Sequence, residues 1–118
     1  MVAAIVFHTA DPERLGAFYA RALGLAAPKA YGPAHLGLKL PDGYLGFERG
    51  ERPAGERITV WFGVDDVEEA YPRWLELGGR PCAAPTREES AGEIIATLHD
   101  PDGNRIGLVC PARATAQE

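Results

Sequence analysis

A turn sequence occurs twice in this chain, each time before a strand-like run. Residues 97–110, TLHDPDGNRIGLVC, contain Asp-Pro-Asp-Gly, where proline presets φ and glycine allows a positive φ. The earlier copy is PDG at residues 41–43, and the runs that follow place Gly46 and Gly107 in equivalent positions, 61 residues apart (107 − 46). A repeated hairpin of this kind indicates that the whole chain repeats one module.

The first copy opens with a β-rich run at residues 3–9 and then carries a helix signal. Asp11 can accept hydrogen bonds from free backbone N–H groups, and Pro12 is tolerated at the first helical position. Gly24 is typical of a helix end. Apolar residues with helical spacing lie between these signals, at Leu15, Phe18, Tyr19, Ala22 and Leu23.

The same order of elements restarts after a polar, Gly- and Pro-bearing linker at residues 50–56. Residues 57–64 predict a strand, and either Asp65 or Asp66 can cap a second helix, since each has a glutamate three residues on. That helix is predicted to end at Gly78 and Gly79. Pro72 should remove one backbone hydrogen bond from this helix. The remaining strands are predicted at residues 28–31, 35–40 and 44–49 in the first copy and at 81–86, 93–99 and 104–109 in the second, with a polar connector at 87–92.

Two βαβββ copies of this size cannot each bury a sheet face alone, so they should pair. The predicted fold is therefore α+β, with tandem βαβββ modules whose curved mixed sheets enclose a central cleft. Within a single domain of residues 1–118 we expect module one at about 1–50, the linker at about 50–56, module two at about 57–111 and a flexible tail at about 112–118.

Charge and composition exclude several partners. The net charge of −5 disfavours nucleic acid and anionic membranes, which both reward clustered Lys and Arg. No apolar run approaches the roughly 20 residues that span a bilayer, and the N-terminus lacks the basic region of a signal peptide. Cys82 and Cys110 form no metal-like cluster and are expected to be a buried pair of reduced thiols. These features predict a cytoplasmic protein.

Three segments carry a resemblance to a known family: VFHTADPERLGAFYARALGL, VWFGVDDVEEAYPRWLELGG and LHDPDGNRIGLV. Together they resemble the vicinal oxygen chelate superfamily, which includes glyoxalase I, bleomycin-resistance proteins and extradiol dioxygenases. The resemblance covers nearly the whole chain. It implies two βαβββ modules around a cleft, a homodimer and, in the metalloenzymes, a divalent ion at the centre of the cleft.

The same resemblance implies four metal-ligand positions, one on each first strand and one on each last strand. In this sequence those positions hold Ala4, Thr59, Gly46 and Gly107. Alanine and glycine side chains cannot bind a metal, and a lone threonine hydroxyl is a poor ligand. We therefore expect neither a metal nor another cofactor at the family's site, and glyoxalase or dioxygenase activity is disfavoured. A divalent metal would need a displaced site.

Alternation along the strands predicts which side chains share a face of the sheet. Val6 and His8 share one face, as do Gly46 and Glu48, and a glycine within a strand often marks a close approach by another group. That group is either a ligand or a bulky neighbour that fills the space. The candidate ligand-binding residues are His8, Tyr44, Gly46, Glu48, Thr59, Trp61, Arg105 and Gly107. Residues expected only to pack are Phe18, Tyr19 and Trp74; those expected outside the site are His35 and His99.

Three functions are compatible with these residues. The first is metal-free binding of a small, partly aromatic molecule in the cleft, for which bleomycin-resistance proteins are the precedent. The second is an enzyme of the lyase, isomerase or dioxygenase type, using a displaced metal site or acid–base chemistry by His8 and Glu48. The structural alternative to such chemistry is that His8 is bonded to backbone and Glu48 pairs with an arginine. The third function is an interaction or regulatory module whose cleft is filled. The first is the prediction, and catalytic residues stay open.

Overall fold

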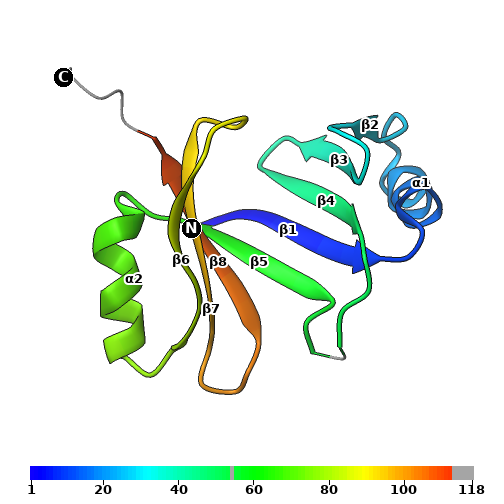
Figure 1. The fold of residues 1–118 in the computed structure, drawn as a ribbon. Helices are drawn as coiled ribbons and strands as arrows, with labels where there is room; N and C mark the ends of the chain where they lie inside the picture. The colour runs from blue at the N-terminus through cyan, green and yellow to red at the C-terminus, as the bar shows by residue number, and fades with distance from the viewer. Residues whose placement is uncertain (54, 113–118) are drawn as a thin grey trace. The chain divides into compact units, whose positions relative to one another are not determined.

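A computed structural model describes residues 1–53 and 55–112. It confirms an α+β fold made of two βαβββ modules with mixed strand pairing (Figure 1). The first module contains β1 (Val2–Thr9), α1 (Pro12–Leu23), β2 (Lys29–Ala30), β3 (His35–Leu40) and β4 (Gly43–Arg49). The second contains β5 (Ile58–Gly63), α2 (Val67–Glu76), β6 (Arg80–Glu88), β7 (Glu93–His99) and β8 (Arg105–Pro111).

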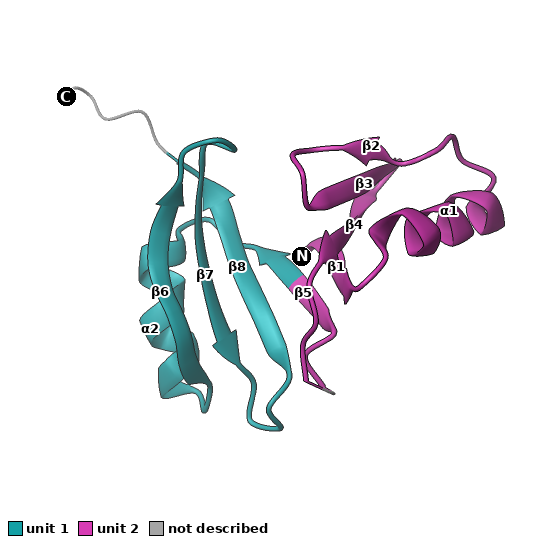
Figure 2. Cartoon of the chain, turned by 45° about the vertical axis from the view of Figure 1, so that its right-hand side comes forward, with its two compact units in different colours: residues 1, 61–118 teal, residues 2–60 magenta. Residues whose placement is uncertain are grey.

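Two compact units divide the chain (Figure 2). The N-terminal unit spans residues 2–60, and the C-terminal unit consists of residue 1 and the residues from Trp61 onward. Strand β5 belongs to both, since residues 58–60 lie in the N-terminal unit and residues 61–63 in the C-terminal one. The module boundaries and the cleft that were expected from the sequence stay predictions.

In the N-terminal unit the strands follow the order β2-β3-β4-β1. β1 runs parallel to β4, and β2 runs antiparallel to β3. β3 and β4 are also antiparallel, as the turn at residues 41–43 between them predicts. Helix α1 covers one face, where the Phe7 ring stacks on Tyr19 at 5.0 Å and on Phe47 at 5.6 Å between centroids. Because successive side chains alternate, the residues next to Phe7 and Phe47 lie on the opposite face of the sheet.

Both ends of α1 match the sequence signals. The Asp11 carboxylate accepts a hydrogen bond from the Arg14 backbone N–H at 3.1 Å, and Gly24 ends the helix with a φ of +70°. The expectation that Phe18 packs into the core is wrong, because its side chain is 61% exposed. The buried line of α1 runs through Pro12, Gly16 and Ala20, spaced four residues apart. Phe18 is two residues from both Gly16 and Ala20, which places it on the opposite side of the helix.

In the C-terminal unit the strands follow the order β5-β8-β7-β6, and Figure 2 shows α2 along one face of β6, β7 and β8. Asp66 caps α2 by accepting from two backbone N–H groups at 3.0 and 3.3 Å. The helix continues through Pro72 to Glu76, and Gly78 follows with a φ of +121°, which confirms the predicted stop. The core of this unit contains Val67, Ala70, Tyr71, Ala96, Leu98, Leu108 and Cys110.

Other expectations about the C-terminal unit need correction. Cys110 is buried, but Cys82 is exposed, since it lies on the edge strand β6, and neither forms a disulfide. The polar connector begins later than predicted, because Arg87 and Glu88 still pair with β7. Apart from Ala112, the predicted tail lies outside the described residues. Among the helices described, none has the length and apolar character that crossing a membrane requires.

Candidate functional site

A row of polar side chains crosses the N-terminal unit on the face opposite α1. Strand pairing places His35 of β3 opposite Glu48 of β4, and Glu48 opposite His8 of β1. The row continues to β5, where the Thr59 hydroxyl lies 3.0 Å from His8 Nε2. Four adjacent strands therefore each contribute one polar side chain, and Phe7 and Phe47 fill the other face.

His35 lies at the centre of a hydrogen-bonded triad, Tyr44–His35–Glu48. Its Nδ1 is 2.5 Å from Glu48 Oε1, and its Nε2 is 2.8 Å from the Tyr44 hydroxyl. The carboxylate can only accept, so Nδ1 carries a proton, and in neutral histidine Nε2 is then the acceptor for the phenol. The His35 side chain is 22% exposed and that of Glu48 is 39% exposed, so solvent reaches the triad.

The phenol of Tyr44 stays protonated over a wide pH range. The pKa of Tyr44 is raised from 10.0 to about 12, mainly by burial and in part by Tyr31 and Glu48, whose negative charge a phenolate would meet. Tyr44 therefore interacts with His35 and with any ligand as a neutral hydroxyl group.

Two glycines explain how these rings fit against the sheet. Gly37 and Gly46 are direct partners in the β3–β4 ladder. A Cβ atom on Gly46 would lie 2.7 Å from His35 Cε1, and one on Gly37 would overlap the Tyr44 ring. The His35 and Tyr44 rings are parallel to each other, with an interplanar angle of 1°. The space that Gly46 leaves in the strand is thus occupied by His35.

The equivalent glycine of the C-terminal unit is also covered by a ring. A Cβ atom on Gly107 would lie 2.5 Å from Cδ2 and Cζ3 of Trp61. Thr97, the ladder partner of Gly107, is 4% exposed, and its hydroxyl has no hydrogen-bond partner within the part of the chain that the structure describes. Arg105 begins β8 and is half-buried.

These contacts test whether the residues fit the metal of the metalloenzymes that the sequence resembles. Carboxylates in place of Gly46 and Gly107 would collide with His35 and Trp61, and the Thr59 hydroxyl is already bonded to His8. Across residues 1–53 and 55–112, no group of three or more His, Cys, Asp or Glu side chains could hold a metal ion. The residues present therefore do not fit that metal.

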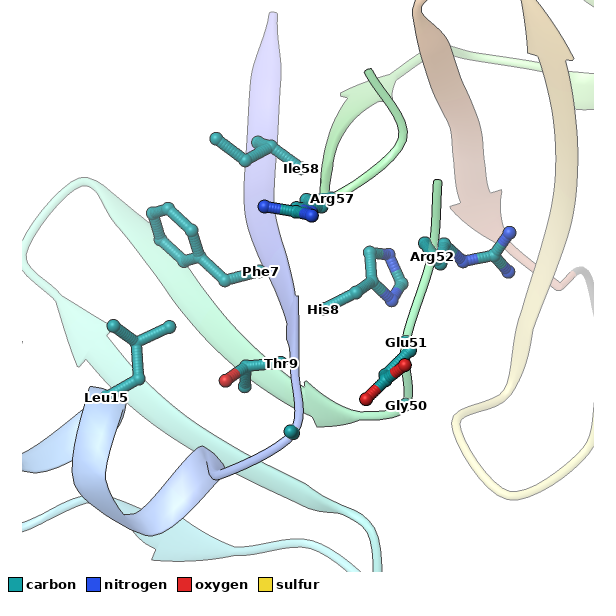
Figure 3. A pocket seen from close by; sticks show the side chains of 10 residues that line it. Phe7, His8, Thr9, Leu15, Gly50, Glu51, Arg52, Arg57 and Ile58 are labelled. Atoms are coloured by element: carbon teal, nitrogen blue, oxygen red, sulfur yellow. The ribbon is translucent and has the colours of Figure 1, made fainter. Parts of the chain in front are cut away.

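A pocket of about 530 Å³ lies at the carboxyl end of β1, within the N-terminal unit. Figure 3 shows Phe7 and His8 on opposite sides of β1. The lining combines apolar side chains with polar and charged ones: Phe7, His8, Thr9, Ala10, Leu15, Gly50, Glu51, Arg52, Arg57 and Ile58. Its volume lies within the range of about 300–1,000 Å³ that is usual for small-molecule sites.

The predicted site residues fall into two groups. His8, Tyr44, Gly46, Glu48 and Thr59 come together in the N-terminal unit. The other group, in the C-terminal unit, is Trp61, Arg105 and Gly107.

His35, expected outside the site, lies between two of the predicted residues. A signal for it was present in the sequence, since counting outward along both strands from the turn at residues 41–43 pairs His35 with Glu48.

Comparison with known proteins agrees with this architecture. The sequence model of the glyoxalase-like domain matches residues 4–109. No curated protein sequence matches the chain. Among solved structures, a hypothetical protein from Bacillus halodurans C-125 is 18% identical, with a TM-score of 0.73 over 98% of this chain and 96% of that one.

Two further structures support the same fold. Methylmalonyl-CoA epimerase from Mycobacterium tuberculosis is 19% identical, with a TM-score of 0.70 over 99% of this chain and 91% of that one. A glyoxalase/bleomycin resistance protein/dioxygenase superfamily member from Vibrio splendidus is 18% identical, with a TM-score of 0.66 over 93% and 97%. These identities establish the fold alone. The family model, by contrast, covers residues 4–109, so the chain belongs to the glyoxalase-like domain family.

Proposed function

We propose that this protein binds a small organic molecule in the pocket at the end of β1, without the metal of the family's metalloenzymes. Membership of the family implies small-molecule binding. The pocket of about 530 Å³ is the observation that carries the proposal, because it is large enough for such a ligand and combines apolar with polar lining.

The lining indicates the chemistry of the ligand. Phe7, Leu15 and Ile58 offer an apolar wall for an aromatic or aliphatic body. Of the two arginines in the lining, Arg52 is paired with Glu56 at 3.4 Å, so Arg57 is the guanidinium that an anionic group of a ligand would meet. A molecule with an apolar body and a neutral or anionic polar group fits best. Sequestration of a cationic drug fits less well, although the net charge of −5 permits it.

The test uses a named probe, 1-anilinonaphthalene-8-sulfonate, which joins an aromatic body to an anionic group. We expect saturable, one-to-one fluorescence enhancement by protein dialysed against EDTA. Ile58→Asp should weaken binding by at least about tenfold, since it places a charge on the apolar wall. The matched control is Leu77→Asp, because Leu77 is also exposed, at 75% against 49% for Ile58, and does not line the pocket.

Two results would contradict the proposal. One is binding that Ile58→Asp leaves unchanged, which would place the probe elsewhere. The other is binding that appears only after a divalent metal is added. The homodimer that the resemblance implies stays part of the proposal, and light scattering of the purified protein checks it.

An enzyme is the second candidate function. The acid–base pair expected from the sequence, His8 and Glu48, consists of ladder partners. However, the structure bonds Glu48 to His35 and His8 to Thr59. Direct cooperation between His8 and Glu48 would require these hydrogen bonds to break. Acid–base chemistry is therefore better supported at His35 than at His8.

A further inference from the structure

The hydrogen bonds of the Tyr44–His35–Glu48 triad follow a fixed order from the carboxylate through the imidazole to the phenol. Glu48 accepts from one nitrogen of His35, and the opposite nitrogen meets the Tyr44 hydroxyl at 2.8 Å. A carboxylate that orients an imidazole, which in turn contacts a hydroxyl, is the arrangement by which enzymes move protons between a substrate and a histidine. Neither Tyr44 nor His35 lines the pocket at the end of β1, so this inference goes beyond the proposed ligand binding and does not depend on it.

Packing alone does not account for this arrangement. Glycines within strands weaken a sheet, and polar groups are costly to bury. Here two facing glycines, Gly37 and Gly46, leave the room in which the Tyr44 and His35 rings lie parallel against the backbone. The two glycines therefore lower strand stability, and the space they leave allows Tyr44, His35 and Glu48 to form a continuous hydrogen-bonded chain.

The hydrogen bonds define how a proton would move. With neutral His35, the Tyr44 hydroxyl donates its proton to Nε2, and its oxygen lone pairs remain to accept a proton from another molecule. As that proton arrives, the original O–H bond of Tyr44 breaks and an Nε2–H bond forms. The substrate keeps the electron pair of its own broken O–H or C–H bond, and the Tyr44 oxygen keeps the pair of its original O–H bond. Glu48 offsets the charge of the imidazolium. Tyr44 remains a neutral phenol throughout.

We propose that this triad is a proton relay: Tyr44 removes a proton from a hydroxyl group or an activated C–H group of a bound molecule and passes its own proton to His35. The protein would thus have a metal-free acid–base activity. Tyr44 is the group that touches the substrate, His35 stores the proton, and Glu48 is a positioning residue that holds the imidazole.

Several charged or titratable groups surround His35 and contribute to its pH response. Glu48 and Tyr44 bond to it directly, and the Tyr31 ring lies 6.4 Å from it between centroids. The Lys29 ammonium lies 5.7 Å from the Tyr31 ring centroid, and His8 adjoins Glu48 in the β1–β4 ladder. The relay needs neutral His35, because Nε2 must be free to accept the Tyr44 proton.

The test uses 5-nitrobenzisoxazole as a carbon acid. A base removes its ring C–H proton, the N–O bond breaks, and the coloured 2-cyano-4-nitrophenolate is released. We expect the protein to accelerate this reaction above the buffer rate. Tyr44→Phe and His35→Gln should each lower the acceleration by at least about tenfold, since a positioned base contributes roughly 10²–10⁴. His99→Gln is the matched control, because His99 belongs to the other unit.

Two further measurements separate the relay from a structural role. Glu48→Gln should shift the pH profile of the rate, because the amide no longer offsets the imidazolium charge. The relay moves the Tyr44 hydroxyl proton, which exchanges with solvent, so the rate should fall in D₂O.

A rate no faster than buffer, a rate that Tyr44→Phe leaves intact, or the absence of a solvent isotope effect would each overturn the relay. Urea unfolding of each variant identifies losses that come from misfolding. Probe binding by 1-anilinonaphthalene-8-sulfonate, measured on the same variants, reports separately on the pocket.

Discussion

Replacing Gly46 by alanine tests the position of His35 directly. The new Cβ atom would lie 2.7 Å from His35 Cε1 and 3.0 Å from Nε2, whereas ordinary contacts begin at 3.4 Å. The imidazole must move by roughly 0.7 Å (3.4 − 2.7). That movement weakens its hydrogen bonds to Tyr44 and Glu48, each worth about 1 kcal/mol in net terms. With the strain of overpacking, the free energy of unfolding should fall by about 2–3 kcal/mol.

Gly43 in the same strand supplies a matched control. A Cβ atom there meets nothing within 4 Å, and its φ is not positive. Gly43→Ala should therefore leave stability unchanged or raise it by about 0.5 kcal/mol, because alanine has less conformational freedom to lose on folding. Urea unfolding followed by far-UV circular dichroism measures both variants. A loss of 2–3 kcal/mol moves the midpoint down by about 1 M or more.

The reasoning also predicts how the effect depends on His35. In a His35→Ala background the obstructing ring is absent. The nearest neighbour left is Val6 Cγ2 at 3.2 Å, which has to shift by only a few tenths of an ångström, so Gly46→Ala should cost less than about 1 kcal/mol. If Gly46→Ala costs the same with and without the imidazole, the ring does not lie over Gly46, and the reading of this face is wrong. Equal effects of Gly46→Ala and Gly43→Ala would lead to the same conclusion.

Three further predictions concern other parts of the molecule. Gly107→Ala should destabilise the protein by about 1–3 kcal/mol and alter the near-UV circular dichroism of Trp61; an unchanged spectrum and midpoint would contradict the contact. Thr59→Val should cost about 1 kcal/mol, because it removes the hydrogen bond to His8. Thr97→Val should be neutral or stabilising by up to about 1 kcal/mol, because the Thr97 hydroxyl is buried without a partner among the described residues. Urea midpoints compare the two variants, and a larger loss of stability in Thr97→Val would refute both assignments. The pKa of Tyr44 is raised from 10.0 to about 12, so unfolded chains lose this proton first and stability should fall as pH rises through 10 to 12, less steeply in Tyr44→Phe; identical pH curves would count against the shift.

The two βαβββ modules place different side chains over the equivalent glycines of their last strands. The two glycines at the expected carboxylate positions are not simply vacancies in the sheet. Each is covered by a ring, His35 over Gly46 and Trp61 over Gly107. In the N-terminal unit the ring is an imidazole that is hydrogen-bonded to Glu48 and Tyr44. In the C-terminal unit it is an indole that packs against the strand. The two modules therefore differ in the polar groups that lie over this glycine.

The sequence by itself determined the local features of this protein. The helix caps, the αL glycine at position 24 and the hairpin turns depend on residues only a few positions apart, so their chemistry is readable directly. Strand alternation likewise predicted that His8 shares a face with Val6, and Glu48 with Gly46, since the period of two is a property of the extended backbone.

Only the tertiary structure decided which groups meet. A helical stripe in the sequence identifies apolar positions but not which of them the sheet covers. In the structure Tyr19 stacks on Phe7, whereas Phe18 lies exposed. Alternation places Gly46 on a face, but the ring that covers it depends on the rotamer of a residue in the neighbouring strand. Glu48 has a histidine beside it on each neighbouring strand, His8 and His35, and only the structure shows that it bonds to His35. Distances across a sheet are set by packing and not by order along the chain.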